Sequence, residues 1–96
     1  MKIKILSVDP LEGYKLFIRF NEGSEGVLDV SDLAGKGVFK TWEDDNNFYK
    51  VFVSNESRAI TWPGDIDIDT LNAYFTIKNI NPDDYFKKEK EHATYL

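Results

Sequence analysis

Side chains alternate in type between residues 14 and 20, and this alternation constrains the fold more than any other feature. The set that recurs at every second position is Tyr14, Leu16, Ile18 and Phe20. Because successive side chains of a β-strand point to opposite faces, this set predicts a strand with one face packed on a core. Phe17 lies between two basic residues on the other face, so it is either covered by a helix or partly exposed.

Two further strands extend this one into an antiparallel meander. Residues 3–8 are apolar but alternate imperfectly, which indicates a strand buried on both faces or a strand with a bulge. The turn sequences DPLEG and NEGS separate the three runs, and residues 25–30 form the third strand. Gly26 inside that third strand indicates either a bulge or a close packing contact.

The remaining chain predicts short helices, two more strands and a final helical region. Residues 31–47 favour short helical pieces that cover one face of the sheet, and residues 49–54 and 58–62 are rich in β-branched and aromatic side chains. Helix-start signals follow at Asp69-Thr70 and at Asn81-Pro82. We therefore expect an α+β fold, with an about five-stranded, mostly antiparallel sheet, short helices packed on it and a C-terminal helix.

The length predicts one domain, because 96 residues leave no room for a second core. We expect a single α+β domain over residues 1–86. Residues 87–96 form a charged sequence that we expect to be a frayed tail.

The composition excludes several kinds of chemistry and partner. The sequence contains no cysteine, which excludes disulfides, thiolate nucleophiles and sulfur-ligated metals. The net charge of −5, with scattered basic residues, disfavours direct binding of nucleic acid, because such binding depends on neutralising phosphates. No apolar run approaches the roughly 18 residues that a membrane span requires, and no signal-peptide core is present. We therefore expect a cytoplasmic protein without a membrane partner.

Three aspartates alternate with isoleucines in the segment AITWPGDIDID. Asp65, Asp67 and Asp69 match the first half of an EF-hand calcium loop, but Thr70 and Thr76 replace the required glycine and glutamate. In the alternative interpretation, the isoleucines pack inward and Asp69 caps the helix that follows. We expect no metal and no cofactor. A small metal-binding or carboxylate-site enzyme that uses the three aspartates is the alternative hypothesis.

Other residue types do not assemble a recognisable catalytic site. His92 lies in the charged tail, whereas a Ser-His-Asp arrangement requires a histidine that its neighbours hold rigidly. General acid–base catalysis requires a carboxylate with a shifted pKa in a cleft, and the sequence indicates neither. We therefore expect that the protein is not an enzyme.

Two aromatic and two acidic residues are the candidates for binding a protein partner. They are Phe17, Trp62, Asp65 and Asp67. Single exposed aromatic residues are common, but an exposed apolar patch marks a partner surface. Packing in the core is the alternative role for both aromatic residues.

Four motifs occur in a fixed order along most of the chain. They are YKLFIRFNEGSEGVLDVSDL from residue 14, GVF from residue 37, FYKVFV from residue 48 and ITWPGDIDI from residue 60. In this order they resemble a small bacterial domain-of-unknown-function family, number twenty-four forty-two. Asp29, Trp62 and Asp67 fall on positions that mark the family, but the glycine after Trp62 stands one place from its usual position.

The resemblance implies an α+β fold with an antiparallel sheet and flanking helices, and no established activity. It also implies a gene of the kind that often stands beside that of another small protein, in a pair that resembles a toxin–antitoxin system or another two-component module. Our leading hypothesis is a non-enzymatic protein-interaction module, the antitoxin-like member of such a pair, whose acidic charge suits a basic partner. An exposed edge strand could also pair two copies into a homodimer.

Overall fold

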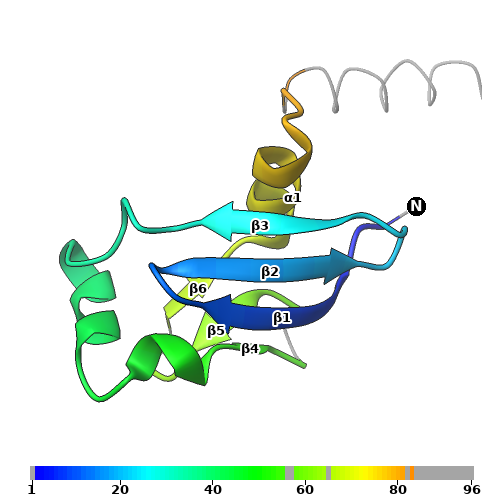
Figure 1. Cartoon of the computed structure of the whole chain (residues 1–96). Helices are drawn as coiled ribbons and strands as arrows, with labels where there is room; N and C mark the ends of the chain where they lie inside the picture. Colours follow the sequence, from blue (N-terminus) through cyan, green and yellow to red (C-terminus); the bar gives the residue numbers. More distant parts are fainter. Residues whose placement is uncertain (1, 56–57, 65, 82, 84–96) are drawn as a thin grey trace, which may run out of the picture.

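The computed structural model describes residues 2–55, 58–64, 66–81 and 83. Within them, six strands form two antiparallel three-stranded sheets, one in front of the other in Figure 1. The first sheet contains β1 (Ile5–Leu11), β2 (Lys15–Phe20) and β3 (Glu25–Asp29), and the second contains β4 (Phe52–Val53), β5 (Ile60–Trp62) and β6 (Ile66–Ile68). Two 3₁₀ helices, η1 (Gly37–Glu43) and η2 (Asn47–Lys50), connect the sheets, and α1 (Thr70–Lys78) follows them.

The first sheet is the meander that the alternating side chains predict. Leu16, Ile18 and Phe20 of β2 are buried, as expected for the face that packs on the core. The pairing of β1 with β2 shifts register between Ile5 and Ser7. This bulge explains the imperfect alternation of the first strand, because an inserted residue moves the following side chains to the other face.

The prediction of an α+β fold is confirmed, but the prediction of a single five-stranded sheet is wrong. β1 and β4 lie against each other, yet they belong to separate sheets. The segment after Trp62 forms a sixth strand, since Gly64 has a φ of +95° and reverses the chain so that β6 pairs with β5. Ile66 is buried and Asp67 is exposed on this strand, in agreement with the predicted alternation.

The strand predicted over residues 49–54 is shorter than expected. Asn46 has a left-handed backbone, with a φ of 58°, and a 3₁₀ helix begins directly after it. The turn carries Phe48 into the core, so that strand pairing starts only at Phe52. The two 3₁₀ helices were expected to cover a face of the sheet, but they lie at one end of both sheets (Figure 1).

One apolar core joins the two sheets, the 3₁₀ helices and α1. Its buried side chains include Ile18 and Phe20 from the first sheet, Ile60 and Trp62 from the second, and Phe75 from α1. Phe17 and Val27, on the outer face of the first sheet, do not belong to this core.

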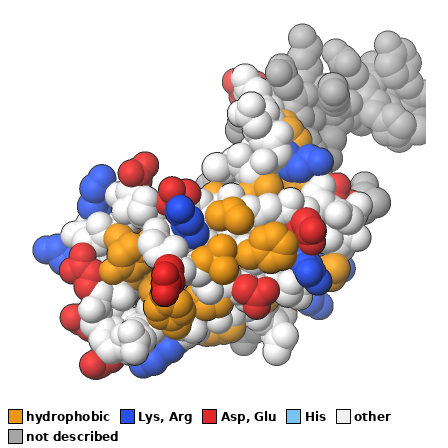
Figure 2. Space-filling view, viewed as in Figure 1, with side chains coloured by type: hydrophobic (Ala, Val, Ile, Leu, Met, Phe, Trp, Pro, Cys, Tyr) orange, Lys and Arg blue, Asp and Glu red, His pale blue; other side chains and the backbone are white. Residues whose placement is uncertain are grey.

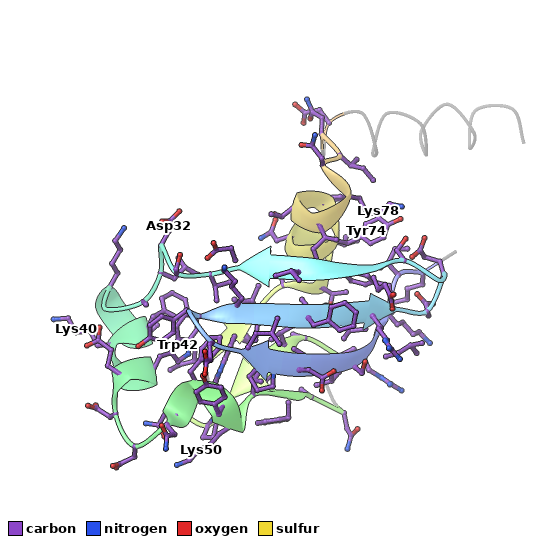
Figure 3. The ribbon with its side chains drawn as sticks, in the orientation of Figure 1. Asp32, Lys40, Trp42, Lys50, Tyr74 and Lys78 are labelled. Atoms are coloured by element: carbon purple, nitrogen blue, oxygen red, sulfur yellow. The ribbon has the colours of Figure 1, made fainter. Side chains whose placement is uncertain are left out.

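Helix α1 is positioned by a cap at its start and by close packing on β3. The Asp69 carboxylate accepts a hydrogen bond from the Asn72 amide at 3.1 Å, which confirms the predicted cap. Gly26 of β3 faces Ile77 so closely that an added Cβ would lie 2.5 Å from a methyl carbon. Of the two alternatives predicted at Gly26, a bulge or a close packing contact, the structure shows the contact, because Gly26 pairs in regular register with Ile18. Tyr74 extends from α1 towards the turn after β2 (Figure 3).

The second helix-start signal lies at the end of the described residues. The Asn81 side chain accepts a hydrogen bond from the Asp83 amide at 2.9 Å, which is the contact expected of a capping asparagine. The tail predicted over residues 87–96 lies outside the described residues, and so does His92.

Candidate interaction surface

The outer face of the first sheet carries exposed apolar side chains at its centre. Val27 of β3 pairs directly with Phe17 of β2, and Leu11 of β1 is the diagonal neighbour of Phe17 on the same face. Val27 is 51% exposed and Leu11 is 38% exposed, while Phe17 is half-buried between them. Figure 2 shows hydrophobic side chains gathered across this face. We call Leu11, Phe17 and Val27 the outer-face patch.

Charged pairs border the outer-face patch at both ends of β2. At one end, the Arg19 guanidinium lies 3.2 Å from the Glu25 carboxylate and 5.6 Å from the centre of the Phe17 ring. At the other end, Lys15 pairs in register with Asp29. Exposed ion pairs add little to stability, so these side chains are better suited to the polar rim of an interface.

Hydrogen bonds fix one of these rim carboxylates. The Asp29 carboxylate accepts hydrogen bonds from the Ser31 side chain and from the Ser31 backbone amide, and the amide lies at 2.9 Å. These bonds, with a smaller contribution from Lys15, hold the pKa of Asp29 below its ordinary value of 3.8. Asp29 therefore presents a fixed negative charge at neutral pH.

The structure places Phe17 on the solvent side of the first sheet. Among the described helices, η1 and η2 lie at the end of the sheets and α1 lies beside β3, so this face is left uncovered (Figure 1). Of the two alternatives left open by the sequence, partial exposure is therefore the correct one for Phe17.

Trp62, the second aromatic candidate, lies in the core. Its side chain is 1% exposed, and its indole nitrogen donates a hydrogen bond to the Phe48 carbonyl oxygen at 2.9 Å. The core role that the sequence left open for Trp62 is confirmed. The sequence could not decide between a core and a surface position for Trp62, because a side chain at a strand end beside a Pro-Gly turn can face either the core or the solvent.

The aspartates of the DIDID segment have separate roles where the structure describes them. Asp67 is exposed on β6, and Asp69 caps α1. Asp65 lies outside the described residues. Among the residues that the structure describes, no three side chains of the metal-binding types gather closely enough to hold an ion.

The fold and this surface can now be compared with known proteins. A family model described as "Protein of unknown function (DUF2442)" matches residues 5–78. The chain belongs to this family. The match spans both sheets and α1 and confirms the resemblance that the motif order indicates. No curated protein and no solved structure matches the chain. Within the described part of this DUF2442 chain, no helix is long and apolar enough to pass through a membrane.

Sequence reasoning missed a second feature of this DUF2442 protein, a hollow of about 330 Å³ at the end of the two sheets. The turn between β1 and β2 forms one wall, and the two 3₁₀ helices form the other. Four aromatic and two acidic residues line it, namely Tyr14, Trp42, Phe48, Tyr49, Glu12 and Glu43. These residues come from segments about 30 positions apart, so that no local pattern brings them together. We call this feature the aromatic hollow.

Proposed function

We propose that the protein is a non-catalytic interaction module that binds a small protein partner through the outer-face patch. The observation that carries the proposal is the outer-face patch, which lies beside the exposed Asp9 of β1 on a sheet face that no described helix covers. Exposed apolar patches with polar rims mark protein-binding sites, and an aromatic anchor at the centre is typical of them. Phe17 has that central position.

The charge of the chain supports a basic partner. The net charge is −5, and opposite charge on a partner accelerates encounter and disfavours acidic competitors. As the resemblance to the family implies, we propose that this partner is encoded beside the protein and that the protein acts as the antitoxin-like member of the pair.

The roles of the aspartates support a function without catalysis. Asp69 is engaged in capping α1, and Asp67 stands on the solvent side of β6 while its neighbours Ile66 and Ile68 turn inward. Asp69 therefore has a structural role, and Asp67 is a solvent-exposed side chain. They lack the convergence of carboxylates that acid–base or metal chemistry requires.

Co-expression with the product of the neighbouring gene, followed by size-exclusion chromatography and calorimetry, tests this proposal. We expect co-elution at micromolar concentration, and we expect Phe17→Ala to raise the dissociation constant about 30-fold, the effect of losing a central aromatic anchor. Val38→Ala is the matched control, because Val38 is 64% exposed on η1 and lies outside the outer-face patch. It should change the constant less than threefold, which is roughly what a residue outside the interface does.

Three results would contradict the proposal. The first is separate elution of the two proteins, and the second is a complex that Phe17→Ala leaves intact. The third is a stable dimer of the chain alone that Phe17→Ala dissociates, since the patch would then be occupied by a second copy. Circular dichroism of each variant establishes that the fold is retained.

A further inference from the structure

The aromatic hollow combines ring faces with carboxylates. Its volume of about 330 Å³ lies at the lower end of the range of ligand-binding pockets, and such a size suits a side chain or a small molecule. Glu12 stands at the β1–β2 turn and Glu43 at the end of η1, and both are exposed. Trp42 and Phe48 are each 2% exposed, so the half-buried Tyr14 and the exposed Tyr49 supply the rings that a ligand can reach, and Glu12 and Glu43 form an acidic rim.

The lining of the hollow selects for a planar cation. The faces of aromatic rings carry partial negative charge, and carboxylates carry full negative charge, so that both attract a cation. Among the described lining residues, none is basic, and Lys40 extends from η1 on the side opposite to Trp42 (Figure 3). A guanidinium group stacks on rings and pairs with carboxylates in a fixed fork, whereas an ammonium group is a hydrated point charge.

The rings that line the hollow are held in place by one another. The Tyr14 ring stacks on Trp42 at 6.2 Å and meets Phe48 edge-on at 5.2 Å, and Trp42 meets Phe48 at 5.1 Å. Tyr14 and Asn46, both in the lining, have positive φ angles of 58°. The φ of Tyr14 belongs to the turn between β1 and β2, where Gly13 also has a positive φ, and asparagine adopts this conformation more readily than most residues.

A buried donor in the lining lacks a partner. Trp42 is 2% exposed, and its indole N–H has no hydrogen-bond acceptor in the described structure. Trp62, by contrast, donates to a backbone carbonyl. The nitrogen atom is itself buried, so a ligand in the hollow affects the Trp42 indole through the Tyr14 and Phe48 rings that pack on it.

We propose that the aromatic hollow binds the guanidinium group of an arginine in the protein partner. The guanidinium stacks against the accessible rings of Tyr14 and Tyr49, and the carboxylates of Glu12 and Glu43 pair with its charge. This inference rests on the proposed function, and it adds a second contact point, at the end of the sheets, to the outer-face patch. It also specifies that the basic partner contacts the protein through an arginine.

A titration of the ¹⁵N-labelled full chain with N-acetyl-arginine N-methylamide tests the inference without the partner. We expect saturable shifts of the Trp42 indole N–H and of the Asn46 and Tyr49 amides. N-acetyl-citrulline N-methylamide has nearly the same shape without the charge, and it should bind at least about tenfold more weakly. The double variant Glu12→Gln/Glu43→Gln should raise the dissociation constant of the arginine probe about five- to tenfold, because each exposed pair contributes up to about fivefold.

Asp32→Asn is the matched control for charge, because it removes one carboxylate at an exposed position that does not line the hollow. It should change the constant less than twofold, since distant exposed charges are screened. Equal binding of the citrulline probe, shifts confined to other surfaces, or an unchanged constant in the double variant would overturn the inference.

The two proposals fail separately. If the arginine probe does not bind while the partner binds through Phe17, the inference about the hollow is wrong and the proposed function stands. If the probe binds as expected while no partner co-elutes, the hollow has the proposed chemistry and the interaction through the outer-face patch is wrong.

Discussion

Replacing Gly26 with alanine tests how tightly α1 packs on the first sheet. The new Cβ would lie 2.5 Å from Cγ2 of Ile77, whereas carbon atoms in contact are about 3.5–4.0 Å apart. Either the side chain or the helix must move by about 1 Å, and overpacking of this kind costs about 1–3 kcal/mol. Alanine also restricts the unfolded chain, which offsets about 0.4–1 kcal/mol. We therefore expect the free energy of unfolding to fall by about 1–2 kcal/mol.

Urea denaturation provides the assay, because Trp42 and Trp62 are both buried and their fluorescence reports unfolding. The matched background is Ile77→Ala, which removes the methyl carbon that the new Cβ would meet. In this background, Gly26→Ala should be neutral or stabilising by up to about 1 kcal/mol. The reasoning would be refuted if Gly26→Ala destabilised both backgrounds equally, or if it left the wild-type chain unchanged.

Three further substitutions test the packing and the electrostatics. Asp69→Ala removes the cap of α1 and should lower the free energy of unfolding, measured in urea, by about 1 kcal/mol. Asp67→Ala, the control, should change it by less than about 0.5 kcal/mol. Equal losses in the two variants would contradict the capping role of Asp69. Trp62→Phe removes the hydrogen bond from the indole to the Phe48 carbonyl oxygen, whereas Trp42→Phe removes no hydrogen bond. In urea denaturation, Trp62→Phe should therefore lower the free energy of unfolding by about 1 kcal/mol more than Trp42→Phe does. A larger loss for Trp42→Phe would contradict this account. The Glu22 carboxylate accepts hydrogen bonds from the Ser24 side chain and, with a smaller effect, from the Ser24 backbone amide, and these bonds lower the pKa of Glu22 below its ordinary value of 4.5. The stability linked to this carboxylate is therefore present above pH 4.5 and is lost as the pH falls through the lowered value. Glu22→Gln should flatten the pH dependence of unfolding below pH 4.5, and an unchanged slope there would contradict this account.

The local parts of the fold could be predicted from the sequence because local rules govern them. The alternation around Ile18, with turn residues on both sides, is enough to predict the meander and the face on which Phe17 lies. Gly26 signals a close contact because a strand interior seldom contains glycine without a reason. The Asp69 cap follows from a single residue type directly before a helical stripe.

The parts that the sequence did not predict depend on contacts between distant segments. Whether β1 and β4 pair or only touch is decided by how the 3₁₀ helices turn the chain, and no period in the sequence records that. The start of η2 depends on two consecutive residues with positive φ, Asp45 and Asn46, and these residue types are compatible with a strand or a helix on either side.

The same reason limits what the sequence says about the two candidate sites. Phe17 could be recognised because it breaks a local pattern of charged residues. Trp62 could not be assigned to the core or the surface from its turn alone. The aromatic hollow brings Glu12 and Tyr14 against residues of η1 and η2, so that only the folded chain shows it.

Methyl and aromatic NMR of the chain, titrated with the product of the neighbouring gene, tests the central claim most directly. The account predicts that signals of Leu11, Phe17 and Val27 shift or broaden with a common saturation point, while the exposed methyl groups of Val38 do not. Saturable binding that perturbs Val38 and leaves the three signals of the outer-face patch unchanged would contradict it.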